Sequence, residues 1–227
     1  MSTGRNQLLA APWHTAVVVA ALAVNAYTGF VRSAALREAV TVDRPALYLR
    51  TILVEWLVLG LVLGGVWLHR SPVRAVLGER WRSPILFLQD LGIAIAFVVV
   101  SVFVTSLLGA HGHAAATDPA VKFLMPATGK EKWLWVLVAL SAGICEEAVY
   151  RGYLQQQFAG MAGSIPVGIV LSAVLFGASH AYQGTRPALI IAFGGLLSGM
   201  LAWWRKSVRP GMIAHTLQDL LAIVVPH

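Results

Sequence analysis

The chain has few charged residues for its size. Only 12% of its 227 residues are charged, whereas a soluble domain has about 25%. Hydrophobic residues make up 58% of the sequence, and the mean hydropathy is +0.73. A surface this poor in charge is suited to lipid, so composition argues against an ordinary soluble protein.

Cysteine is almost absent, and acidic residues are outnumbered by basic ones. The single Cys145 excludes an intramolecular disulfide and says nothing about the compartment. A net charge of +7 could by itself indicate nucleic-acid binding. Here the basic residues collect in short loops between apolar runs, which is typical of membrane topology and headgroup contact. We therefore expect the lipid bilayer as a partner, and no nucleic acid.

Long apolar runs are abundant, and each approaches the roughly 20 residues that a spanning helix needs. They are continuous and do not alternate with polar residues, which favours helices over a barrel. We predict an all-α, polytopic helical bundle in the plasma membrane of a prokaryote, with residues 1–227 as one transmembrane domain of about seven helices. The connection Gly109–Lys132 could hold a short interfacial helix. The candidate spans are Trp13–Val31, Leu47–Leu68, Ile85–Leu108, Trp133–Phe158, Ile165–Tyr182, Pro187–Trp204 and Val208–Val225.

Two adjacent acids, Glu146 and Glu147, lie within the fourth run and are followed by Arg151. Ionisable groups at membrane depth are costly and usually functional. On a helix, Glu147 and Arg151 are i and i+4 and can pair. Glu146 is rotated by about 100° from Glu147 and is less neutralised. The spacing therefore predicts a structural Glu147–Arg151 pair and leaves Glu146 for acid–base chemistry.

Two later apolar runs carry further polar residues at helical spacing. Phe176 precedes His180 by one turn, and His215 precedes Asp219 by one turn. The Asp219 carboxylate could therefore fix the tautomer of the His215 ring. A glutamate, two histidines and an aspartate from three helices could hold and activate one water molecule. That arrangement would hydrolyse an amide without a protein nucleophile.

In this order, Glu-Glu-x-x-x-Arg, Phe-x-x-x-His and His-x-x-x-Asn/Asp resemble the motifs of the CPBP family of intramembrane proteases. This family covers CAAX proteases and bacteriocin-processing enzymes and includes the type II CAAX prenyl endopeptidases. The small residues Gly194, Gly195 and Gly199 are also similar to that family. The resemblance covers a core of residues 133–225 and leaves residues 1–132 as accessory helices.

The resemblance implies a glutamic endopeptidase that cleaves a membrane-associated protein or peptide, with or without an attached lipid. Glu146 and His180 would activate the attacking water, while His215 and Asp219 would stabilise the oxyanion. The supporting residues of the site would be Glu147, Arg151 and Phe176. The family's prenyl endopeptidases resemble one another in having Asn where this chain has Asp219. An ionised Asp cannot donate a hydrogen bond, so Asp219 is either protonated or orients His215.

The same residues fit other catalytic chemistries less well. Glu146, His180 and His215 are acceptable zinc ligands, but the His-Glu-x-x-His spacing is absent, so we expect no cofactor. Cys145 reads as a small buried hydrophobe. Glu55 is an isolated acid that could contact substrate, relay protons or pair with Arg50, and Asp90 is equally isolated.

A non-enzymatic function is the alternative hypothesis. A transporter or a bacteriocin-immunity protein could use the same acids and histidines as a proton or ligand site. A transporter would favour broken helices and paired repeats, and the sequence contains no internal repeat. The two hypotheses differ in whether Glu146, His180 and His215 converge on one water-accessible cavity.

Overall fold

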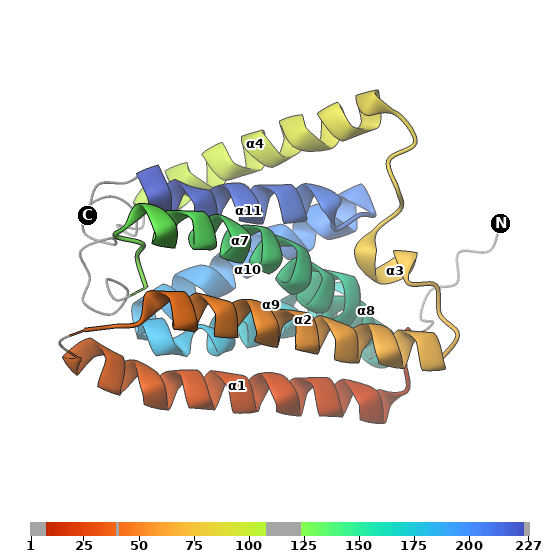
Figure 1. The fold of residues 1–227 in the computed structure, drawn as a ribbon. Helices are drawn as coiled ribbons and strands as arrows, with labels where there is room; N and C mark the ends of the chain where they lie inside the picture. The colour runs from red at the N-terminus through yellow and green to blue at the C-terminus, as the bar shows by residue number, and fades with distance from the viewer. Residues whose placement is uncertain (1–7, 40, 108–123, 225–227) are drawn as a thin grey trace.

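The computed structural model describes residues 8–39, 41–107 and 124–224, and this part of the chain is helical and contains no strand. Figure 1 shows the long helices lying roughly side by side, with α1 and α2 along one edge of the bundle and α4 along the opposite edge. The prediction of an all-α bundle is therefore confirmed.

The described residues of the amino-terminal half form three long helices and one short one. Prolines near the starts of α1 and α2 fit there, because the first turn of a helix has no use for their missing N–H. The Asp43 side chain accepts a hydrogen bond from the Ala46 backbone N–H at 3.0 Å and caps α2. The elements are α1 (Pro12–Glu38), α2 (Arg44–Leu68), α3 (Arg74–Leu77) and α4 (Pro84–Leu107).

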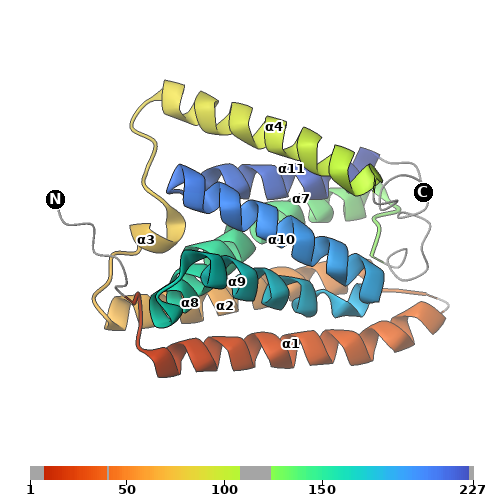
Figure 2. The ribbon, with the colours of Figure 1, turned by 180° about the vertical axis from the view of Figure 1, so that it is seen from behind.

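The carboxy-terminal half supplies the centre of the bundle, as the reverse view in Figure 2 shows. Its first helix begins with a capping box, in which Thr128 and Glu131 each accept a hydrogen bond from the other's backbone N–H. The elements are α7 (Gly129–Glu146), the π-helix η1 (Glu147–Leu154), α8 (Gln155–Ala162), α9 (Ile165–Ser179), the 3₁₀ turn η2 (Ala181–Gln183), α10 (Thr185–Arg205) and α11 (Arg209–Val224).

All seven predicted runs are largely helical, but they differ in length. Two helices, α9 with 15 residues and α11 with 16, are shorter than a full span. The predicted interfacial helix falls mostly on residues 108–123, which lie outside the described residues. Among the residues that the structure describes, five segments are long and apolar enough to cross a membrane: Pro12–Leu36, Arg44–Leu68, Pro84–Val104, Gly129–Ala162 and Thr185–Arg205.

Buried polar side chains tie the start of α1 and the residues just before it to the central helices. Gln157 is fully buried, and its Oε1 accepts from the Leu9 backbone N–H at 2.6 Å. Its Nε2 donates to the Ala10 carbonyl at 3.0 Å and to the Thr15 hydroxyl at 2.6 Å. A buried polar group that loses its hydrogen bond costs free energy. This network therefore fixes the start of α1 against α8.

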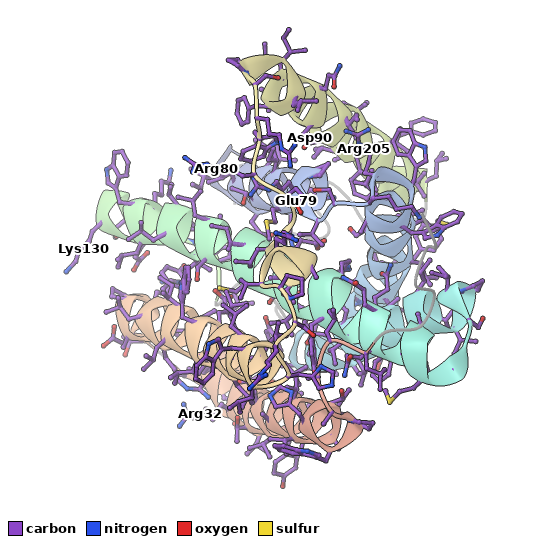
Figure 3. The ribbon with its side chains drawn as sticks, turned by 90° about the vertical axis from the view of Figure 1, so that its right-hand side faces the viewer. Arg32, Glu79, Arg80, Asp90, Lys130 and Arg205 are labelled. Atoms are coloured by element: carbon purple, nitrogen blue, oxygen red, sulfur yellow. The ribbon has the colours of Figure 1, made fainter. Side chains whose placement is uncertain are left out.

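Asp90 is a structural anchor. Its carboxylate accepts hydrogen bonds from Arg205 at 2.8 Å and from the Trp81 indole at 2.9 Å. Figure 3 shows Asp90 and Arg205 facing each other between α4 and α10. The acid that the sequence left unassigned therefore holds the outer helix α4 to the bundle.

Helices α7 and α11 approach each other closely at Gly143. A Cβ atom at this position would lie 2.8 Å from the Met212 carbonyl oxygen and would also meet the Thr216 hydroxyl. The Thr216 hydroxyl donates to the Ala139 carbonyl at 3.2 Å across the same contact. Small residues let membrane helices pack at such short range. This contact sets the distance between Glu146 at the end of α7 and His215 on α11.

We expect Gly143→Ala to destabilise the protein, because the new methyl group must displace backbone atoms of α11. Overpacking of this kind costs about 1–3 kcal/mol, partly offset by the better helix propensity of Ala. Gly60→Ala is the matched control, since its Cβ would meet nothing within 4 Å. Thermal unfolding in detergent should show a lower midpoint for Gly143→Ala alone. Equal midpoints for the two variants would contradict a tight α7–α11 contact.

Candidate active site

The two glutamates stand at a change in helix type. Glu146 is the last residue of α7, and Glu147 is the first residue of the π-helix η1. At its far end, the Gln155 backbone N–H donates to the Tyr150 carbonyl, five residues earlier. A π-helix has a wider turn than an α-helix and occurs often at functional sites. The sequence predicts an α-helix here, and the wider turn is a difference from that prediction.

Glu147 and Arg151 form the ion pair expected from their spacing. Arg151 Nη1 lies 3.0 Å from Glu147 Oε1, and both side chains are 1% exposed. The guanidinium also lies over the Phe176 ring, 4.2 Å from its centroid, which is cation–π geometry. Because Phe176 is on α9, this contact joins η1 to α9. Removing one partner of such a buried pair costs about 3–5 kcal/mol in soluble proteins.

Glu146 lies between the two histidines. Its Oε2 is 4.0 Å from His180 Nε2 and 3.7 Å from His215 Nε2. These separations are too long for direct hydrogen bonds. Oε2 is buried and has no hydrogen-bond partner among the described residues. Buried polar atoms almost always have a hydrogen-bond partner, so we expect a water molecule or a ligand to bind this oxygen.

The orientation of His180 is set by the end of α9. Its Nδ1 lies 2.8 Å from the Phe176 carbonyl oxygen, so Nδ1 carries the proton and donates there. In the neutral ring, Nε2 is then an acceptor directed toward Glu146. The Tyr150 hydroxyl donates to Ser179 Oγ at 2.9 Å, and Ser179 donates to the same Phe176 carbonyl at 2.8 Å. Sequence reasoning missed Tyr150 and Ser179, although both lie within or beside the motifs.

His215 on α11 is surrounded by acids. Its Nδ1 lies 3.4 Å from Glu147 Oε1. Its Nε2 faces Glu146 Oε2 at 3.7 Å and Asp219 Oδ2 at 3.8 Å. The Glu147 contact is not predicted by the sequence, because the spacing pairs that carboxylate with Arg151 alone. His215 thus links the ion pair to the cavity-facing acid Glu146.

A cavity of about 490 Å³ opens beside this cluster, between α1, α2, η1 and the end of α9. Glu146 and His180 line it, as do Tyr150 and Ser179. His215 is not among its lining residues, so the expectation that all three residues line one cavity is only partly correct. Glu55 of α2 lines the cavity too, and its Oε2 is buried without a hydrogen-bond partner among the described residues.

The donor atoms around Glu146 do not form a metal site in the described residues. Within the part of the chain that the structure describes, no group of three or more His, Cys, Asp or Glu residues has the geometry to hold a metal ion. The Glu146 carboxylate is separated from the imidazoles of His180 and His215 by gaps that one bridging atom would fill.

Comparison with known proteins places this cluster inside one family domain. Residues 128–221 match the family model described as Type II CAAX prenyl endopeptidase Rce1-like. The chain matches no curated protein and no solved structure. The match includes all three motifs, from Glu146 to Asp219, and excludes α1, α2 and α4. The resemblance noted in the sequence is thereby confirmed: residues 128–221 are similar to the Rce1-like type II CAAX prenyl endopeptidase family.

Proposed function

We propose that the chain is a membrane-embedded endopeptidase in which Glu146 and His180 activate a water molecule. The observation that carries the proposal is the Glu146 Oε2 atom, which is buried, has no hydrogen-bond partner among the described residues, and faces the Nε2 atoms of two histidines. The family match supports a protease acting at a membrane. Glu146 and His180 also line one cavity, which favours hydrolysis over a transport site.

A water molecule bridging Glu146 and His180 would fill the gap between them. Each oxygen–nitrogen hydrogen bond spans about 2.7–3.2 Å, so a bent bridge fits the 4.0 Å separation. That water would donate one hydrogen bond to His180 Nε2 and one to the Glu146 carboxylate. As the water oxygen attacks the carbonyl carbon of a peptide bond, Glu146 would take one proton, and the other would stay on the oxygen, hydrogen-bonded to His180 Nε2. Glu146 would then give its proton to the amine nitrogen as the C–N bond breaks and the new carboxyl group forms.

His215 is proposed to stabilise the oxyanion. In the imidazolium form its Nδ1–H points to Glu147, and its Nε2–H is left for the developing negative charge. Asp219 Oδ2 lies 3.8 Å from Nε2, beyond hydrogen-bond distance. The lack of a direct hydrogen bond at this distance supports a role for Asp219 as a protonated donor to the oxyanion or a neighbour of it, in preference to a role in holding the ring.

Glu147, Arg151 and Phe176 are proposed to position these groups without touching substrate. The substrate would be a membrane-associated protein or peptide, with or without an attached lipid. Apolar side chains such as Leu22, Val54 and Val58 line the same cavity as Glu146, so an apolar substrate segment could lie beside the acid. The proposed location is the plasma membrane of a prokaryote.

We expect Glu146→Gln to lower peptidase activity by about a hundredfold or more, because Gln keeps the volume but cannot take a proton. Cleavage of a lipidated reporter peptide by the purified variant is the measurement. Glu79→Gln is the control, since Glu79 is an exposed acid paired with Arg74. Both variants should keep the unfolding midpoint of the unaltered protein. Normal turnover in Glu146→Gln would overturn the catalytic assignment.

Asp219→Asn should retain activity within about tenfold. Asn can donate to an oxyanion, and the Asp219 carboxylate makes no short contact with His215 that Asn would lose. If an ionised Asp219 instead held the imidazole, loss of the charge-assisted bond would lower kcat by about tenfold or more. Steady-state kinetics on one substrate separates the two roles. A loss as large as that of Glu146→Gln would place Asp219 in the essential chemistry.

Activity should persist in strong chelators, since a carboxylate and an imidazole can activate water without an ion. The assay compares turnover before and after incubation with a chelator, followed by dialysis. Loss of activity that zinc alone restores would replace the glutamate mechanism with a metal-dependent one. Unchanged turnover would leave the glutamate mechanism standing.

A further inference from the structure

We propose that the connection between α3 and α4 and the connection between α10 and α11 together bind the phosphate group of an anionic phospholipid. The site consists of Arg80, Arg82, Lys206 and Arg209, which we call the basic cluster. None of the four lines the cavity beside Glu146, so the site is independent of the proposed peptidase reaction. Arg80 and Arg82 also lie outside the family match.

The two connections are in contact at Gly78. Its φ of +78° is one that glycine adopts readily, and it turns the chain after α3. A Cβ atom there would lie 3.1 Å from Ser207 Oγ and 3.2 Å from Arg209 Cγ. Arg209 Nη2 donates to the Gly78 carbonyl at 3.4 Å. Residues 78–82 and 205–209 therefore lie together at the end of the bundle that carries α3 in Figure 1.

Trp81 holds the two connections together and sets the positions of its neighbours. Its indole N–H donates to Asp90 at 2.9 Å, and the Arg209 guanidinium lies over its ring, 4.2 Å from the centroid. Trp81 is half-buried, whereas Arg80 and Arg82 on either side of it are exposed. Figure 3 looks onto this end of the bundle and shows Arg80 and Asp90 there. Since successive Cα atoms are about 3.8 Å apart, all three arginines lie around one indole ring.

Basic residues outnumber acids at this end of the bundle. Residues 69–90 and 205–209 contain seven basic and two acidic residues. No acid among the described residues forms an ion pair with a member of the basic cluster. Cations gathered without counter-ions attract an anionic ligand. Both acids are already paired, Asp90 with Arg205 at 2.8 Å and Glu79 with Arg74 at 3.0 Å.

The guanidinium groups of the basic cluster suit a phosphate group. Arg209 Nε is buried and has no hydrogen-bond partner among the described residues, so protein contacts leave part of this guanidinium unsatisfied. Arginine can donate two parallel hydrogen bonds to phosphate oxygens. The exposed side chains of Arg80 and Arg82 can turn toward the same phosphate. The chemistry that this site recognises is therefore a phosphodiester with its negative charge.

The level of the basic cluster in the membrane indicates a lipid as the source of that phosphate. The candidate spans next to it end at Leu68 and Arg205 and begin at Pro84, so the cluster lies just beyond the apolar segments. Trp203 and Trp204 at the end of α10 are exposed, and tryptophan is enriched at the level of the headgroups. Anionic lipids attract basic residues at this level.

The test compares phosphatidylglycerol with phosphatidylcholine that carries the same acyl chains. Native mass spectrometry of the purified protein measures the affinity for one lipid molecule and does not depend on catalysis. We expect phosphatidylglycerol to bind about tenfold tighter, and the double variant Arg80→Gln/Arg82→Gln to reduce this preference to about twofold or less. Lys130→Gln/Lys132→Gln is the matched control and should keep the preference. It removes two exposed charges at the same spacing from the start of α7, at the opposite end of the bundle.

Cross-linking of the unaltered protein locates the lipid without relying on the stability of a variant. A phosphatidylglycerol analogue with a photoreactive headgroup should label residues 78–82 and 205–209. Labelling confined to other segments, equal affinity for the two lipids, or equal loss of the preference in both double variants would overturn the proposal. Glycerophosphoglycerol is the same headgroup without acyl chains. If it binds as tightly as the lipid, the site takes a soluble phosphate ester and the assignment to a lipid is wrong.

Discussion

The buried ion pair between Glu147 and Arg151 is the interaction on which the site depends. Taking both charges out of solvent is costly, and each stays buried only while the other neutralises it. Glu147 also contacts His215 on α11, and Arg151 contacts Phe176 on α9. One pair in η1 thus fixes the two helices that carry the histidines. The placement of His180 and His215 around Glu146 follows from it.

Much of the fold could be predicted from the sequence, because apolar runs and the scarcity of charge are strong signals for membrane helices. The three polar motifs could also be located, since a charge within an apolar run stands out. The separate environments of Glu146 and Glu147 followed from their angular offset. These features depend on the spacing of residues along a single helix, which can be read directly from the sequence.

Other features depend on contacts between distant segments and could not be predicted. The π-helix from Glu147 to Leu154 has no spacing signature, because the same residues read equally well as α-helix. Glu55 and Arg50 were considered as a pair on α2, yet both instead line the cavity beside α7 and α9. The contact of Glu147 with His215 joins residues 68 positions apart. Contacts between such distant residues depend on how the helices pack, for example on the close approach of α7 and α11 at Gly143.

The hydrogen bonds of Gln157 bear on where the functional unit begins. The family match starts at residue 128, but Gln157 is satisfied by the backbone of Leu9 and Ala10, and the Tyr153 hydroxyl contacts His14 at 2.8 Å. A fragment cut at the edge of the match would leave these polar groups facing lipid. The unit that folds is therefore larger than the matched domain, because residues at the start of α1 supply the hydrogen-bond partners of buried side chains on η1 and α8.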